Sequence, residues 1–315
     1  MESELVSIVL VTWNSAPYLR RCLDGIRQQT HRSREFIAVD NASADASAEL
    51  VAGEAARLIR NDTNRGFSAA VNQAIAVARG EFVLVVNPDC YLLPEYVERL
   101  VEALRSADDW GSATGLLIRA RGYDIEPTTE IDSAGMRMTR NGRHLDIDVR
   151  PAGRTEVFGV SGAAAMFRRS FLQDVAIGGE ALDEDFFAYR EDADVAWRGR
   201  LFGWRSLCEP AAVAYHVRRV TPEARRELPP DVNMHSVKNR FLLRLKNQGP
   251  YLALRNAPFE LFRDLVVLLA ALTIERTSLP AFSWLWHNRA RILAKRREVQ
   301  RRRKVSDREL REWFR

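Results

Sequence analysis

Three short runs of aliphatic and β-branched residues constrain the fold of this chain more than any other feature. They occupy Val6–Val11, Phe36–Val39 and Phe82–Val86, and a weaker run of the same kind occupies Arg57–Asn61. Such runs are typical of strands that are buried on both faces. The segments between them favour helices, at about residues 18–29, 46–56 and 68–79. Strands and helices that alternate in this way predict an α/β fold with a mostly parallel, doubly wound sheet.

Polar residues follow three of these strands, at Thr12–Asn14, Asp40–Asp45 and Asn87–Asp89. Ligands of such sheets bind outside the carboxyl ends of the strands, so we expect the three clusters to face one crevice. Asp89 would place a carboxylate on its floor, a ligand that suits Mg²⁺, although Asn87-Pro88-Asp89 is equally consistent with a simple turn. Asp40 likewise has two interpretations. It could accept a hydrogen bond from a nucleobase or ribose, or it could be a helix N-cap or part of an Asx-turn.

The most unusual stretch is Asp183–Arg198, which holds six carboxylates within twelve residues, interleaved with Phe186, Phe187 and Tyr189. Crowded carboxylates raise one another's pKa, so they need a cation or a shared proton. The plainer alternative is a solvated helix start, because Asp and Glu favour the first turn of a helix. A helix is expected from about Glu191 to Phe202, ended by Gly203.

The 315 residues carry a net charge of +5 that is distributed unevenly. Residues 1–216 hold 24 Lys and Arg against 32 Asp and Glu, a net of −8, and residues 217–315 hold 23 against 10, a net of +13. This asymmetry predicts that the two parts meet different partners. Three widely spaced cysteines and an acidic N-terminus with no signal-peptide pattern favour a reducing, cytoplasmic setting.

The basic C-terminal third is expected to be helical. Basic helices are predicted at Asn233–Asn247 and in the run Arg289–Lys304, and an apolar helix is predicted to begin at Asn256-Ala257-Pro258 and to reach about Glu275. The apolar centre of that helix is shorter than the roughly 20 residues that span a bilayer. Amphipathic helices with Arg and Trp favour peripheral attachment to anionic lipid. A solvated appendage or an oligomer interface are the alternatives, and nucleic acid is not expected, because the aromatic residues lie outside the arginine run.

Together the polar motifs resemble those of the family 2 glycosyltransferases, and more narrowly the bacterial rhamnosyltransferase branch. In chain order they are Thr12-Trp13-Asn14, Asp40-Asn41-x-Ser43-x-Asp45, Asn64-x-Gly66-Phe67 with Asn72, Asn87-Pro88-Asp89, Ser161-Gly162, and Asp183–Arg198. Six motifs in order within about residues 5–220 form a specific signal. The resemblance implies a GT-A fold with a nucleotide-binding half and an acceptor half. It divides the chain into a catalytic domain, residues 1–220, and a basic helical C-terminal region, residues 221–315.

The resemblance also implies roles for individual residues. The nucleotide-sugar donor would be bound by Thr12, Asn14, Asp40, Asn64, Gly66, Asn87 and Asp89. A divalent metal, Mg²⁺ or Mn²⁺, would be held by Asp89 and His216, and Asn87 stands where many relatives carry an acidic residue. Asp192 would be the catalytic base, at a helix N-terminus whose dipole favours its ionised form. The acceptor side would be supported by Glu191, Asp194, Trp197 and Arg198.

We therefore expect an inverting, metal-dependent glycosyltransferase. By the resemblance it transfers L-rhamnose from dTDP-L-rhamnose to a lipid-linked or cell-surface polysaccharide. Its expected partners are a nucleotide-diphosphate sugar, a polyprenyl-diphosphate-linked or glycan acceptor and an anionic membrane surface, with a homo-oligomer also open. The expected location is cytoplasmic, peripheral on the inner face of the cell membrane.

Two other functions share some of these sequence features. A nucleotidylyltransferase shares the sheet and the metal carboxylates, but it would carry a Gly-rich, Lys-bearing loop after the first strand. Here that position reads Thr12-Trp13-Asn14-Ser15, without lysine. A non-catalytic scaffold that binds nucleotide or membrane through the basic third is the other alternative.

Overall fold

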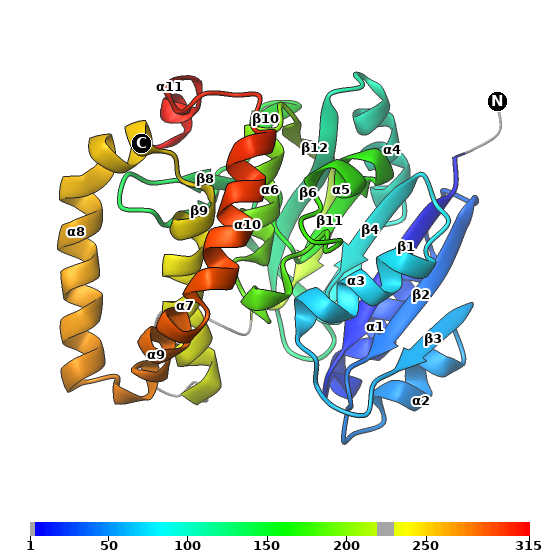
Figure 1. Cartoon of the computed structure of the whole chain (residues 1–315). Helices are drawn as coiled ribbons and strands as arrows, with labels where there is room; N and C mark the ends of the chain where they lie inside the picture. The colour runs from blue at the N-terminus through cyan, green and yellow to red at the C-terminus, as the bar shows by residue number, and fades with distance from the viewer. Residues whose placement is uncertain (1–3, 219–229) are drawn as a thin grey trace.

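The computed structural model describes residues 4–218 and 230–315, and its main element is a ten-stranded mixed sheet (Figure 1). Eight strands follow the order β10-β12-β6-β11-β4-β1-β2-β3, while β5 pairs with β12 and β7 pairs with β6. The strands are β1 Val6–Thr12, β2 Arg34–Asp40, β3 Arg57–Arg60, β4 Phe82–Val86, β5 Cys90–Leu92, β6 Trp110–Arg121, β7 Glu126–Ser133, β10 Thr155–Val157, β11 Ala164–Arg168 and β12 Arg205–His216; a separate hairpin pairs β8 Met136–Met138 with β9 His144–Asp146.

The first half of the sheet is parallel, as the sequence predicts. Strand β1 pairs in parallel with both β2 and β4, and β2 pairs in parallel with β3. Strand β11 runs antiparallel to both β4 and β6, which restores the common direction for β6 and its parallel neighbour β12. The carboxyl ends of β1, β2, β4, β6 and β12 therefore lie along one edge, where the predicted crevice should be.

Helices cover both faces of this sheet because its central strands are apolar on both sides. In β1, Ile8 and Leu10 pack into the core beneath α1 and α4, whereas Val9 and Val11 pack into the core shared with α3, α5 and α6. The helices of these two layers are α1 Ala16–Arg27, α2 Ser47–Ala52, α3 Phe67–Val77, α4 Tyr96–Arg105, α5 Arg169–Val175 and α6 Glu191–Leu201. The α/β fold class is confirmed, and α6 ends just before Gly203, whose φ of 92° suits glycine.

The C-terminal part is helical, also as predicted, and it packs on the α3–α5–α6 side of the sheet (Figure 1). Its elements are α7 Pro230–Asn247, α8 Pro250–Thr273, η3 Arg276–Ser278, α9 Pro280–His287, α10 Arg289–Arg302, α11 Asp307–Leu310 and η4 Arg311–Trp313. Ser306 and Glu309 form a capping box at α11. Among the helices of the two described ranges, none is long and apolar enough to cross a membrane. The predicted domain boundary at residue 220 lies outside the described residues, so the division stays a prediction.

One predicted boundary was wrong. Helix α8 begins at Pro250, which occupies the first turn where a proline N–H is not needed, and it continues through Pro258 instead of starting there. Strand β12 is a single strand with a bulge between Glu209 and Val213.

The acidic and basic parts contact each other through buried ion pairs, and the prediction that they also meet different partners stays a prediction. Lys246 of α7 lies fully buried between Asp183 and Asp194, with its Nζ 2.7 Å from Asp194 Oδ1. Lys295 of α10 lies 2.5 Å from Asp183 and 3.1 Å from Asp185. The pKa of Asp183, which burial alone would raise, is held well below its usual value by these two lysines. The acidic stretch therefore finds its cations within the chain.

Replacing Lys246 by Met should destabilise the protein by about 3–5 kcal/mol, because Asp183 and Asp194 would lose the buried cation that lies between them, leaving only Lys295 and Arg198 to offset their charges. Chemical denaturation monitored by circular dichroism measures the loss. The matched control is Lys304→Met, since that lysine is 67% exposed and 3.9 Å from Asp174, and it should change stability by less than about 0.5 kcal/mol. Equal effects of the two substitutions would contradict this account of the network.

Candidate active site

The first wall of the crevice is formed by the loops after β1 and β2. Thr12 Oγ1 donates to Asp40 Oδ1 at 2.9 Å, and the backbone N–H of Ser43 donates to Asp40 Oδ2 at 3.0 Å. Asn14 has a φ of 48° and accepts the N–H of Ala44 on its side-chain oxygen at 2.8 Å. These bonds tie the two loops together and fix the position of the buried Asp40 carboxylate at the strand ends.

The loop before α3 joins this wall to the acidic stretch. Asn64 Oδ1 accepts both the N–H of Gly66, at 2.9 Å, and the side-chain amide of Asn41, at 2.8 Å. Gly66 has a φ of 86°, and a Cβ there would lie 2.5 Å from the ring of Phe187. The N–H of Ser68 then donates to the Phe187 carbonyl at 3.1 Å. Glycine at position 66 is therefore required both by backbone conformation and by close contact.

Asp89 and His216 meet at the carboxyl ends of β4 and β12, and their arrangement suits a divalent metal. His216 Nε2 lies 3.5 Å from Asp89 Oδ1, an oxygen that is buried and has no hydrogen-bond partner within the described residues. His216 Nδ1 is 2.7 Å from Asp132, so a carboxylate orients the ring from behind, as is usual for metal-binding histidines. Cys90 lies near the same point, but burial raises the pKa of its thiol well above the usual value. Asp89 and His216 are therefore the two fitting ligands.

The charge state of His216 follows from its neighbours. Burial lowers the pKa of His216, but its contacts with Asp132 and Asp89 outweigh burial and raise that pKa to about 9. Burial raises the pKa of Asp132, and the hydrogen bonds from His216 and Arg218 reverse that effect and lower it. Without a metal the ring is thus cationic at neutral pH, and a metal would replace its Nε2 proton.

Asp192 lies in the first turn of α6, on the opposite side of the crevice. Its Oδ2 accepts the N–H of Gly162 at 3.1 Å, and its Oδ1 accepts the N–H of Ala193 at 2.7 Å. The carbonyl of Ala163, the residue after Gly162, accepts the N–H of Asn87 at 2.8 Å. Segment 161–163 therefore connects Asp192 to the Asn87–Asp89 motif. Burial raises the pKa of Asp192 despite these hydrogen bonds. The N-terminus of α6 favours the ionised form, as expected, but desolvation is the larger effect on this pKa.

The turn that presents Asp192 is held in an uncommon backbone conformation. Phe187, Tyr189 and Arg190 all have positive φ, between 64° and 70°, which costs free energy for residues other than glycine. The side-chain amide of Asn239, on α7, donates to the carbonyls of Phe186, Ala188 and Tyr189 at 2.7–2.9 Å. Lys238 Nζ donates to the Asp185 carbonyl at 2.5 Å. The C-terminal helix therefore stabilises the turn, a role that the sequence motifs did not indicate.

The predicted supporting residues of α6 lie behind the crevice. Asp194, Trp197 and Arg198 are all at most 1% exposed. Arg198 Nε donates to Asp194 at 2.9 Å, and its Nη2 donates to the Ala181 carbonyl at 2.9 Å. Their contacts orient α6, and any effect on the acceptor is indirect. Glu191 is buried beside Asp192, and burial followed by the charge of Asp192 raises the pKa of Glu191 to about 8.

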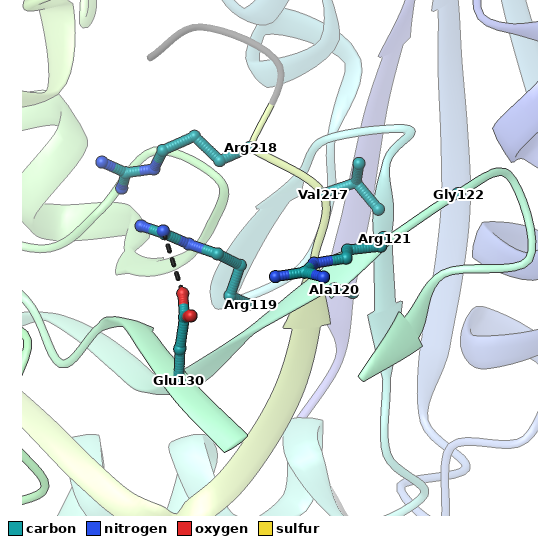
Figure 2. A pocket seen from close by; sticks show the side chains of 7 residues that line it. All are labelled: Arg119, Ala120, Arg121, Gly122, Glu130, Val217 and Arg218. Carbon is teal, nitrogen blue, oxygen red and sulfur yellow. Dashed lines mark hydrogen bonds and ion pairs between the residues drawn. The ribbon is translucent and has the colours of Figure 1, made fainter. Parts of the chain in front are cut away.

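A pocket of about 420 Å³ opens beside the Asp89–His216 pair, and sequence reasoning did not identify it. Figure 2 shows the side chains of Arg119, Arg121 and Arg218 around it, from β6 and from the segment after β12. Arg218 Nε lies 2.9 Å from Asp132 Oδ1, and Asp132 also contacts His216. Because Arg119 and His216 are partners in the sheet register, the pocket adjoins the candidate metal ligands. Glu130 also lines the pocket and pairs with Arg119 at 3.1 Å, while Arg218 pairs with Asp132 and Asp146, so three arginines and one carboxylate give the lining an excess of donors that suits phosphate groups.

Replacing Glu191 by Gln should change how stability depends on pH. Because the pKa of Glu191 is raised in the folded state, folding favours its protonated side chain. The stability that the protonated Glu191 contributes is complete below about pH 4.5 and is lost as the pH rises through about 8. The variant cannot ionise, so its unfolding free energy relative to wild type should increase between pH 6 and pH 9. Denaturation at several pH values measures this difference, and a constant difference would show that Glu191 ionises normally.

Comparisons with known proteins give the relatives of this chain. The chain is 27% identical to EpsH of Bacillus subtilis strain 168, provisionally named a glycosyltransferase, over 82% of this chain and 70% of that protein. It is 28% identical to the N-acetylglucosaminyl-diphospho-decaprenol L-rhamnosyltransferase of Mycobacterium tuberculosis, over 68% of this chain and 76% of the relative.

Among solved structures, the fold is similar to that of the mannosyltransferase PcManGT from Pyrobaculum calidifontis in complex with GDP-Man and Mn²⁺. The TM-score is 0.55 at 21% identity, over 94% of this chain and 83% of that one. The GT-A fold expected from the sequence is thereby confirmed. Residues 7–176 match the family model described as glycosyl transferase family 2. This chain therefore belongs to glycosyl transferase family 2, and it is a glycosyltransferase.

Proposed function

We propose that this glycosyltransferase transfers a sugar with inversion at the anomeric carbon and uses Asp192 as its general base. The observation that carries the proposal is the connection between Asp192 and the Asn87–Asp89 motif through residues 161–163. It connects a carboxylate with the groups that would hold the diphosphate. One-step inversion needs such a base, on the face of the sugar opposite the leaving group.

The donor occupies the wall formed by the first two strands. Asp40, fixed by Thr12 and Ser43, accepts hydrogen bonds from the nucleobase, while Asn14, Asn64 and Gly66 line the nucleotide site. Asp89 and His216 would hold a divalent ion, Mg²⁺ or Mn²⁺, which neutralises charge on the departing diphosphate when bound. Asn87 adds a neutral oxygen where an acid would add a second charge, so metal affinity depends mainly on Asp89.

Asp192 then acts on the acceptor hydroxyl. Its raised pKa makes the carboxylate more basic than an exposed aspartate, which favours removal of the hydroxyl proton as the new glycosidic bond forms. The positive-φ turn and the hydrogen bonds from Gly162 and Ala193 fix the carboxylate before the substrate arrives. Such preorganisation avoids an entropic cost in the transition state.

The proposed substrates follow from the relatives. The rhamnosyltransferase relative supports L-rhamnose from dTDP-L-rhamnose as donor and a polyprenyl-diphosphate-linked glycan as acceptor. The arginine pocket beside His216 supports an anionic acceptor, because Arg119, Arg121 and Arg218 surround a space large enough for phosphate groups. An acceptor of this kind places the enzyme at the inner face of the cell membrane.

Replacing Asp192 by Asn should reduce transfer by at least about 10²-fold, the usual contribution of a general base. Nucleotide binding should persist, because Asp192 does not belong to the donor wall. Product formation followed by mass spectrometry, together with calorimetric titration of the nucleotide, separates the two effects. Full activity in the variant would overturn the assignment.

The donor can be identified by thermal shift with UDP-, GDP- and dTDP-sugars in the presence of Mg²⁺ or Mn²⁺. A ligand that binds only the folded state raises the melting temperature, and dTDP-L-rhamnose should give the largest rise. The rise should be lost in Asp89→Ala and retained in Asp192→Asn. A larger rise in melting temperature with a UDP- or GDP-sugar would show that the donor is that nucleotide sugar and not dTDP-L-rhamnose.

A further inference from the structure

Helix α8 turns polar residues towards the protein and apolar residues towards the outside, which is the reverse of a typical surface helix. Its best-buried residues include Asn256 and Glu260, while Leu254, Leu261 and Phe262 are 68–81% exposed. A helix on the surface of a soluble domain normally buries its apolar stripe and exposes its charges. The opposite arrangement requires an apolar partner on the outer side.

The polar side of α8 is held against α7 by ionic contacts. Arg244 donates to Asp264 at 2.6 Å and lies 3.3 Å from Glu260. Gln248 donates to Glu260 at 2.8 Å. These contacts fix the rotation of α8 about its axis, so its apolar side faces away from the protein core.

The apolar side forms one continuous surface, on the outermost helix of the C-terminal part (Figure 1). Its exposed members are Leu254, Phe259, Leu261, Phe262, Leu265, Val266, Leu268, Leu269 and Leu272. At about 100° per residue they cover roughly half of the helix circumference, which is wider than the narrow seam of a two-helix coiled coil. A second copy that made contact through its own α8 alone would cover only part of this width, whereas lipid covers all of it.

Residues beyond the C-terminal end of α8 suit the boundary between lipid and water. Arg276 is exposed in η3, and Trp286 of α9 is 66% exposed, with the guanidinium of Arg289 lying 4.5 Å from its ring centroid. Tryptophan and arginine side chains favour the headgroup region, where an apolar body and a polar tip are both accommodated.

The arginine run of α10 does not provide the main contact. Arg291 pairs with Asp185, Lys295 with Asp183, and Arg303 with Asp307, while Arg296 donates to the Leu245 and Gln248 carbonyls. Arg291 and Lys295 hold α10 on the catalytic part, whereas Arg296 and Arg303 contact other residues of the C-terminal helices. Arg297 and Arg301 are exposed, so the attachment of amphipathic helices to anionic lipid that the sequence predicts stays a prediction beside the apolar contact through α8.

We propose that the outer face of α8 is a membrane-docking surface that inserts shallowly, parallel to the bilayer, among the acyl chains. The inference rests on the proposed function, since a lipid-linked acceptor must reach the crevice from the same bilayer. Because burial of apolar surface drives the contact, neutral and anionic lipid should both bind, and salt should weaken binding little.

Co-sedimentation of the full-length protein with phosphatidylcholine vesicles, with and without phosphatidylglycerol, tests this. The variant Leu265→Ser/Leu268→Ser/Leu272→Ser removes three exposed side chains, and the bound fraction at limiting lipid should fall at least about tenfold. The control Leu50→Ser/Val149→Ser removes exposed apolar side chains away from α8 and should bind as wild type does. Unchanged far-ultraviolet circular dichroism and melting temperature would show that both variants fold.

The outcomes separate this inference from the proposed function. Vesicle binding that survives 0.5 M salt in the wild type and is lost in the α8 variant supports it. Failure of the wild type to bind, equal binding by the α8 variant, or a dimer in light scattering that the α8 substitutions dissociate, would overturn it. Sugar transfer to a short-chain, water-soluble acceptor should be equal in wild type and in the α8 variant. Its absence in both would count against the proposed function instead.

Discussion

The buried ammonium of Lys246 lies between Asp183 and Asp194, and the organisation of the active site depends on it. Without a cation, this acidic stretch could not be packed against the C-terminal helices, because unpaired buried carboxylates are too costly. With it, α6 is fixed at its base by Asp194, and the preceding turn is fixed by Asp183. Asn239, seven residues before Lys246 on the same helix, then holds the positive-φ backbone that leads to Asp192. One helix from the basic third thus positions the proposed base.

The two walls of the crevice are coupled through short backbone segments rather than through direct side-chain contact. Segment 161–163 carries hydrogen bonds to Asp192 on one side and to Asn87 on the other. Gly66 packs so closely on Phe187 that the loop of the donor wall and the acidic stretch must keep a fixed separation. A displacement of either wall would therefore displace the other, because these contacts join them directly. This rigidity suits a reaction in which the base and the leaving group must be aligned on opposite faces of a sugar.

The extent to which the fold and the site could be predicted follows from the range of the interactions. Strands such as Val6–Val11 and the polar motifs at their ends are local signals, so the parallel half and the position of Asp40, Asp89 and His216 were accessible from sequence. Asp132 and Asn239 were not, because their partners lie 84 and 50–53 residues away along the chain and no local pattern marks them. The raised pKa of Asp192 could not be predicted either, because the burial that outweighs the local helix dipole is set by tertiary packing.

The most direct test of the central claim is the anomeric configuration of the sugar after transfer. With the donor identified, the one-bond carbon–hydrogen coupling at C1 of the product can be compared with that of the donor by nuclear magnetic resonance. The account predicts the opposite configuration, because Asp192 activates an acceptor hydroxyl that attacks from the face opposite the diphosphate. Retention of configuration would contradict it, since a single base on that face cannot yield a retained product in one displacement.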